Sequence, residues 1–142
     1  KFNISYSLYP HEGDWKNAGA WTEGDDFNVP VYAAEPPSLA LDKEHSTRPE
    51  EAPFFSVDAP GVVITGIKRS EEGNELIVRL CEIFGKETVV NLTLPVNISS
   101  ARRLNIIELP LDNPDKPAIT GNSVRVRIKP NEILTLGLNT FL

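Results

Sequence analysis

Residues 62–83, VVITGIKRSEEGNELIVRLCEI, decide the fold that we expect for this chain. Residues 62–68 and 75–83 are two runs rich in the β-branched and aliphatic residues that strands prefer. Between them, residues 71–74 (EEGN) contain a glycine that tolerates the positive φ angle of a tight turn. The stretch therefore predicts a β-hairpin, and no comparable helical periodicity appears after residue 53.

Short apolar runs of the same kind continue along the chain, separated by turn residues about every 8–12 positions. Besides the hairpin, we expect strands over residues 54–57, 87–94, 101–109, 123–129 and 133–138. Residues 110–117, PLDNPDKP, are expected to form a long polar loop. Seven short strands with this spacing predict an all-β fold, an antiparallel β-sandwich.

The beginning of the chain has a different pattern. Apolar and polar residues alternate over residues 2–8, which predicts a half-buried strand that ends at Pro10. Asp14 is expected to cap a short helix that runs from Trp15 to about Trp21. One strand and one helix cannot bury themselves, so we expect residues 2–8 to pair with a sheet in this sandwich, in another copy or in a missing part of a longer protein.

Residues 27–53 carry five prolines and many acidic side chains, which predicts an extended connector. The chain of 142 residues has a net charge of −6, and this argues against nonspecific nucleic-acid binding. No apolar run is long enough for a membrane helix. Cys81 is the only cysteine, which favours a reducing, cytoplasmic location. The absence of methionine suggests that the chain starts inside a longer protein or has lost its N-terminus.

Several stretches, in order along the chain, resemble the family 38 glycoside hydrolases, the α-mannosidases. Residues 6–15, YSLYPHEGDW, resemble the YxLYPHxGDW signature near the C-terminal end of that family. Residues 55–68 and 74–82 look like the segments that follow it, although an aromatic residue is more usual than Cys81. Residues 128–136 fit the closing segment, so the resemblance covers nearly the whole chain.

The resemblance implies a larger parent enzyme. Its N-terminal α/β domain would hold zinc, an aspartate nucleophile and an acid/base carboxylate, and would cleave α-mannosides with retention. Residues 1–52 would then be the end of a large β-sandwich region plus the connector, and residues 53–142 the C-terminal sandwich. The catalytic motifs have no counterpart here, so we expect no catalytic residue and no cofactor in this chain. It would brace the catalytic domain, border the α-mannoside cleft and support homo-oligomerisation.

His11, Glu12 and Asp14 form the most site-like cluster in the sequence. Metal sites usually need three or four ligands, and the other histidine, His45, lies in the connector. Two interpretations remain open. Either His11 bonds a carbonyl, Asp14 caps the helix and Trp15 fills a core, or these three residues border the sugar cleft as candidate substrate-binding residues.

Acidic pairs and aromatic side chains give two further candidates. A retaining glycosidase needs two carboxyl groups about 5–5.5 Å apart. The adjacent pairs Asp25–Asp26 and Glu71–Glu72 are in turn-like contexts and are expected to be solvated. The aromatic residues suit either packing or sugar stacking; they are Tyr6, Tyr9, Trp15, Trp21 and Tyr32.

The alternative to an accessory enzyme domain is a free-standing carbohydrate-binding or interaction sandwich. A carbohydrate-binding module would need exposed aromatics on a sheet face or loop rim. A large exposed apolar patch would instead favour the accessory domain, because such patches mark surfaces that another protein part covers.

Overall fold

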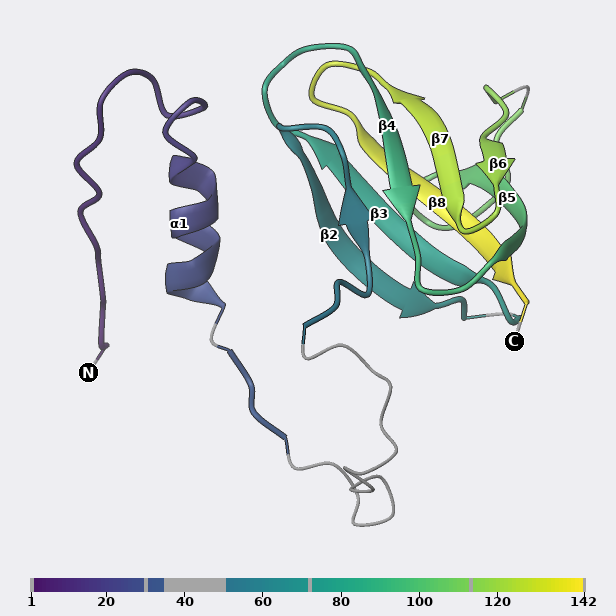
Figure 1. Ribbon diagram of the computed structural model, residues 1–142, viewed down its shortest axis with the longest axis horizontal. Helices are drawn as coiled ribbons and strands as arrows, with labels where there is room; N and C mark the ends of the chain where they lie inside the picture. Colours follow the sequence, from purple (N-terminus) through teal and green to yellow (C-terminus); the bar gives the residue numbers. More distant parts are fainter. Residues whose placement is uncertain (1, 30, 35–50, 72, 113, 142) are drawn as a thin grey trace. The chain divides into compact units, whose positions relative to one another are not determined.

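A computed structural model describes residues 2–29, 31–34, 51–71, 73–112 and 114–141. The chain divides into two compact units, Lys1–Glu50 and Glu51–Leu142, which we describe separately. The strands of the described residues all lie in the second unit, and the first contains one helix, α1 (Figure 1).

The second unit is a sandwich of two antiparallel four-stranded sheets (Figure 1). In spatial order, the first sheet contains β1 (Ser56–Val57), β4 (Thr88–Thr93), β7 (Ser123–Ile128) and β6 (Ala118–Thr120). In spatial order, the second sheet contains β2 (Val62–Arg69), β3 (Leu76–Glu82), β8 (Ile133–Thr140) and β5 (Ile98–Leu104). This architecture confirms the predicted all-β antiparallel sandwich.

The core lies between the inner faces of the two sheets. On β7, the burial alternates, with every second side chain buried, as the VRVRI pattern of residues 124–128 requires. The buried cluster draws mainly on the central strands; its members include Val78, Leu80, Val90, Leu92, Val124, Val126, Ile128, Leu134, Leu136 and Leu138. Each such side chain contributes roughly 1.5–3 kcal/mol when it leaves water, so this unit has a core of its own.

The hairpin predicted from residues 62–83 is confirmed. β2 and β3 pair in an antiparallel register in which Val62 lies opposite Glu82 and Arg69 opposite Leu76. The Ser70 N–H donates to the Glu75 carbonyl at 2.9 Å and closes the turn. Glu72, part of the predicted turn, lies outside the described residues.

The strand expected over residues 101–109 is wrong at both ends, because β5 begins at Ile98 and ends at Leu104. Asn105 ends the strand: its side-chain oxygen accepts the N–H groups of Ile107 at 3.1 Å and Leu109 at 2.9 Å. Such local bonding by asparagine competes with a strand ladder. The expectation also missed β6, three residues after Pro117 that pair with β7.

The strand expected over residues 2–8 is not formed within the described residues, and its pairing with another copy or with a missing part stays a prediction. The segment is extended, but no sheet partner for it exists among the described residues. Its apolar side chains are all at least 83% exposed; they are Phe2, Ile4, Tyr6 and Leu8. The period-two pattern is present, but a strand needs a neighbouring strand to satisfy its backbone.

The helix expected from Trp15 to Trp21 is also wrong, since α1 spans Ala20–Asn28. Gly19 adopts a φ of 66° immediately before α1, and this left-handed residue separates the helix from the preceding turn. The connector therefore does not begin at residue 27. Much of it, at position 30 and over residues 35–50 with His45, lies outside the described residues.

A buried carboxylate joins two turns at one end of the sandwich. Glu82 is 3% exposed and accepts N–H bonds from Phe84, Gly85, Lys86 and Asn131 at 2.8–3.1 Å. Burial alone would raise the pKa of this carboxyl, but the four N–H bonds outweigh that effect and lower its pKa. The charge of Glu82 thus ties the β3–β4 turn to the β7–β8 turn.

Candidate functional site

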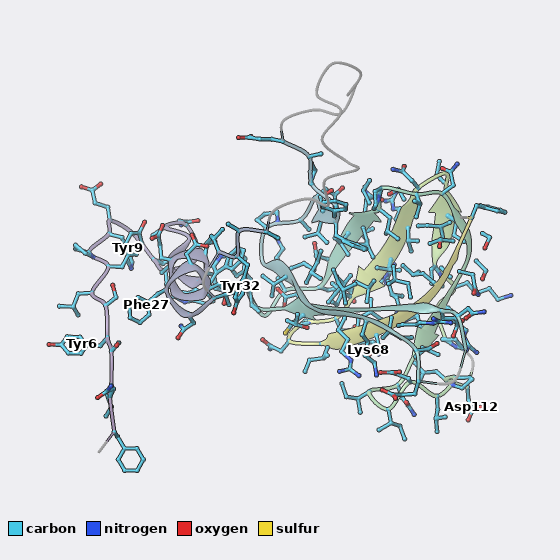
Figure 2. All side chains as sticks on the ribbon, turned by 90° about the horizontal axis from the view of Figure 1, so that it is seen from below. Tyr6, Tyr9, Phe27, Tyr32, Lys68 and Asp112 are labelled. Carbon is cyan, nitrogen blue, oxygen red and sulfur yellow. The ribbon has the colours of Figure 1, made fainter. Side chains whose placement is uncertain are left out.

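The His11–Trp15 segment forms a compact turn ahead of α1. The Tyr9 hydroxyl donates to the Ala18 carbonyl at 3.2 Å, which ties the extended segment to the turn. The His11 ring lies 5.7 Å from the Tyr9 ring, tilted by 37°. Both rings are exposed, whereas Figure 2 shows Tyr6 projecting from the extended segment on its own.

Asp14 shapes this turn. Its carboxylate accepts the Asn17 N–H at 2.8 Å, and its carbonyl accepts the Ala18 N–H at 3.0 Å. This is the capping geometry expected of an aspartate, but it closes a turn that ends at Gly19 and does not begin α1. Asp14 is therefore engaged with backbone groups of its own segment.

The structural interpretation of this cluster expected Trp15 to fill a core. In the described chain Trp15 does not do so. Its side chain is 43% exposed, and the Lys16 ammonium lies 5.5 Å from the ring centroid. An indole face with a cation beside it is a surface on which another group can stack.

Metal ligands do not gather in the part of the chain that the structure describes. No group of three or more histidine, cysteine, aspartate or glutamate side chains is placed to hold an ion there. His11 Nδ1 lies 3.3 Å from the neighbouring Glu12 carbonyl, a local contact. The described residues therefore do not fit a zinc site.

The structure describes one of the two adjacent acid pairs in full, Asp25 and Asp26. Asp25 and Asp26 are exposed and lie in α1, where consecutive side chains point in different directions. They are in a helix and not in the turn that we expected. Glu71 is exposed and pairs with Lys68 at 2.8 Å, and Glu72 lies outside the described residues.

An apolar loop over residues 105–109 was missed by the sequence reasoning, which assigned these residues to a strand. In the 105–109 loop, Glu108 has a φ of 68°, and its carboxylate is 2.9 Å from Arg79 and 3.0 Å from Lys68 (Figure 2, where Lys68 is labelled). These ion pairs fasten the loop onto the second sheet. Three large aliphatic side chains are left exposed; they are Ile106, Ile107 and Leu109.

The two-sheet topology places this chain in the class of antiparallel β-sandwich domains, preceded by a turn that carries the site-like residues. The family model described as "Glycosyl hydrolases family 38 C-terminal beta sandwich domain" matches residues 61–136, more than half of the chain. The chain belongs to this family, which confirms the resemblance drawn from residues 55–82 and 128–136.

The related proteins are α-mannosidases by name. The chain is 34% identical to "Alpha-mannosidase G" of Dictyostelium discoideum over 109 residues, 74% of this chain and 10% of that protein. It is 27% identical to human "Alpha-mannosidase 2C1" over 139 residues, 96% of this chain and 13% of that protein. The mouse protein of the same name is 25% identical over 139 residues. The chain thus spans only 10–13% of the length of these relatives.

Within the described ranges, no helix combines the length and the apolar character that crossing a bilayer requires.

Proposed function

We propose that this chain acts as the C-terminal accessory β domain of an α-mannosidase, a retaining hydrolase of α-mannosides, within a longer polypeptide. The observation that carries the proposal is the family match over residues 61–136, which covers most of the sandwich. The relatives' names supply the activity, and their much greater length leaves room for a separate catalytic domain. In this proposal the catalytic carboxylates and the metal ligands belong to the rest of the enzyme, and the described residues of this chain gather no group of three or more metal ligands.

In this proposal the domain braces the catalytic part of the enzyme. Two exposed apolar surfaces support this role: the face formed by Phe2, Ile4, Tyr6 and Leu8, and the 105–109 loop. Exposed apolar surface of this extent is costly in water and marks places that another protein part covers. The segment of residues 2–8 has the alternation of a strand, so a sheet edge in the preceding part of the enzyme is its natural partner.

The proposal also assigns His11, Asp14 and Trp15 to the border of the sugar cleft. The exposed Trp15 indole would offer an apolar face to a sugar ring, and the exposed His11 ring would bond a hydroxyl group. Asp14 would act through the turn, since its carboxylate holds the Asn17 N–H. Zinc would belong to the catalytic domain. Homo-oligomers would form through surface that the catalytic part leaves uncovered. The lone Cys81 supports a cytoplasmic location.

The distribution of aromatic residues disfavours the alternative of a free-standing carbohydrate-binding sandwich. Every tryptophan and tyrosine precedes residue 33, so the sandwich unit has none. Among its described residues, the exposed aromatic side chains are Phe54 and Phe141, near the two ends of the unit. A sheet face or loop rim lined with stacking aromatics is absent from that part of the structure.

The bracing role predicts a specific pattern of activity loss in the longer polypeptide that contains this sequence. Ile4→Asp with Leu8→Asp places two charges on the face that must be covered, and burying an ionised carboxylate costs more than the roughly 2–7 kcal/mol of a neutral polar group. We expect at least a tenfold loss of α-mannosidase activity and of soluble yield. The matched control, Asn3→Asp with Ser7→Asp, adds the same charge to the opposite face and should retain most activity.

Two results would count against this proposal in distinguishable ways. Turnover of an α-mannoside by the purified 142-residue chain would overturn the accessory role itself. Equal activity of both double variants in the longer polypeptide would overturn only the bracing role of residues 2–8.

A further inference from the structure

A hollow of about 450 Å³ on the sandwich unit gathers positive charge in a chain whose net charge is −6. Four cationic side chains line it: Arg103, Lys116, Arg125 and Arg127. Asp115 is the only carboxylate among the lining residues. Among the lining residues cations therefore outnumber carboxylates, although Glu132 and Glu87 outside the hollow pair with Arg103 and Arg127.

The fold brings these cations together from three separate segments. Arg125 and Arg127 occupy alternate positions of β7, so both point to the outer face of the first sheet, about 7 Å apart along the strand. Lys116 belongs to the loop that enters β6, and Arg103 reaches the hollow from β5 in the other sheet. Because β6 is only three residues long, it leaves part of β7 accessible beside the hollow.

The four cations differ in how strongly the protein already holds them. Arg103 is 7% exposed, and the protein already occupies its guanidinium group. This group lies 2.7 Å from Glu132 and 3.7 Å from Asp115, and it donates to the Arg127 carbonyl at 3.2 Å. Arg127 has one long contact of 3.5 Å with Glu87. Arg103 thus forms one wall of the hollow, and its charge is already paired with carboxylates.

Lys116 and Arg125 are the available cations. Neither makes an ion pair within 4 Å to any residue that the structure describes. The charge of Asp58 interacts with that of Arg125 over a distance, but the two carboxylate oxygens are occupied by the backbone N–H and the side-chain amide of Asn91 at 2.8 and 2.6 Å, and no ion pair within 4 Å joins Asp58 to Arg125. These bonds, more than the charge of Arg125, lower the pKa of Asp58.

We infer that this hollow binds an anion of the phosphate or sulfate class, with Lys116, Arg125 and Arg127 as its direct donors. Guanidinium groups present paired N–H donors that match the oxygens of a tetrahedral anion, and a lysine adds a mobile point charge. Such an anion could be free or carried by a sugar, and the chemistry of recognition is the same in both cases. The inference does not depend on the proposed function.

The test is a titration of the 142-residue chain, followed through its backbone amide resonances, with inorganic phosphate, mannose 6-phosphate and mannose as separate probes. We expect saturable shifts at residues 115–118 and 125–127 with both phosphates and none there with mannose. Lys116→Gln with Arg125→Gln should weaken phosphate binding by about a hundredfold, about tenfold for each lost charge-assisted bond. The control Arg69→Gln removes one charge from an exposed position on β2 in the other sheet and should leave binding unchanged.

Tighter binding of mannose 6-phosphate would indicate a sugar-borne anion, and equal binding a free anion; both support the site. Equal phosphate affinity in the double variant and the wild type would overturn it, as would an equal loss in Arg69→Gln. Shifts at the hollow with mannose alone would overturn the electrostatic basis of the inference.

Because Arg125 is exposed and Lys116 makes no ion pair with the described residues, the double variant should fold normally and keep the amide chemical shifts of β3 and β8. If the double variant loses these chemical shifts, the salt dependence of wild-type phosphate binding provides the test. Phosphate affinity at an anion site should fall several-fold between about 50 and 200 mM NaCl. An unchanged affinity would overturn the proposed site.

Discussion

Replacement of Glu82 by alanine is expected to lower the free energy of unfolding by about 3–5 kcal/mol. The substitution removes the acceptor for four N–H groups, three from residues 84–86 and one from Asn131. These donors lie at a half-buried corner, where an unsatisfied N–H costs about 1–3 kcal/mol. The two turns that Glu82 joins would also lose their link. Urea unfolding followed by circular dichroism measures the change.

Glu87→Ala is the matched control, because Glu87 lies five residues further on and makes only a 3.5 Å contact with Arg127. An exposed pair of this kind contributes about 0–1 kcal/mol. If the two variants were equally stable, the buried carboxylate would not be the link between the two turns.

The same carboxylate should make the stability of the domain sensitive to acid. The folded-state pKa of Glu82 lies below the ordinary value of 4.5. A group of this kind contributes its full stabilisation above the unfolded-state pKa, and the contribution is lost as the pH falls from about 4.5 through the lowered folded-state pKa. We expect the gap in stability between wild type and Glu82→Ala to narrow over this range, as unfolding curves at successive pH values would show.

Replacement of Gly61 by alanine is expected to lower the free energy of unfolding by about 3 kcal/mol or more. Gly61 has a φ of 81°, which costs a side-chain-bearing residue about 1–3 kcal/mol. An added Cβ would also lie 2.4 Å from Cδ2 of the Phe84 ring, closer than packed atoms allow. Overpacking adds about 1–3 kcal/mol because the ring must shift. Thermal unfolding should therefore show a clear fall in Tm.

Gly85→Ala separates the two causes. Gly85 also has a positive φ, 71°, but an added Cβ would only touch the Asn131 side chain at 3.7 Å, an ordinary contact. This variant should carry the backbone cost alone and lose about 1–2 kcal/mol. Equal losses in the two glycine variants would mean that the Phe84 ring moves aside at no cost.

Local patterns were enough to predict the sandwich. The alternation in β7, the glycine turn of the 62–83 hairpin and the run at β8 each specify a strand within a few residues. The same local reasoning extended β5 to residue 109, because Ile106, Ile107 and Leu109 look like strand residues. Asn105 ends the strand through its side chain, and period-two patterning does not register that bond.

The segment of residues 2–8 shows a second limit of prediction from local sequence patterns. Its alternation is as regular as that of any strand in the sandwich, yet no described strand pairs with it. Pattern determines which face of a strand would be buried, whereas pairing requires a second strand in space. The candidate residues His11, Asp14 and Trp15 were found through the resemblance, and the structure adds that Asp14 holds a turn and Trp15 is exposed.

The fold class, the hairpin and the family could be predicted from the sequence, because they depend on residues that are near one another along the chain. The bonds that Glu82 makes and the clustering of cations at the hollow became visible only in three dimensions. In the sequence, Glu82 looks like an ordinary acidic residue at the end of a strand. In the structure, the N–H of Asn131, which is 49 residues later, donates to its carboxylate. Lys116 comes close to Arg125 through the pairing of β6 with β7, and Arg103 joins them only when the two sheets pack together. The interaction between charges depends on their distance in space, and residues far apart in the sequence can be close together in the fold.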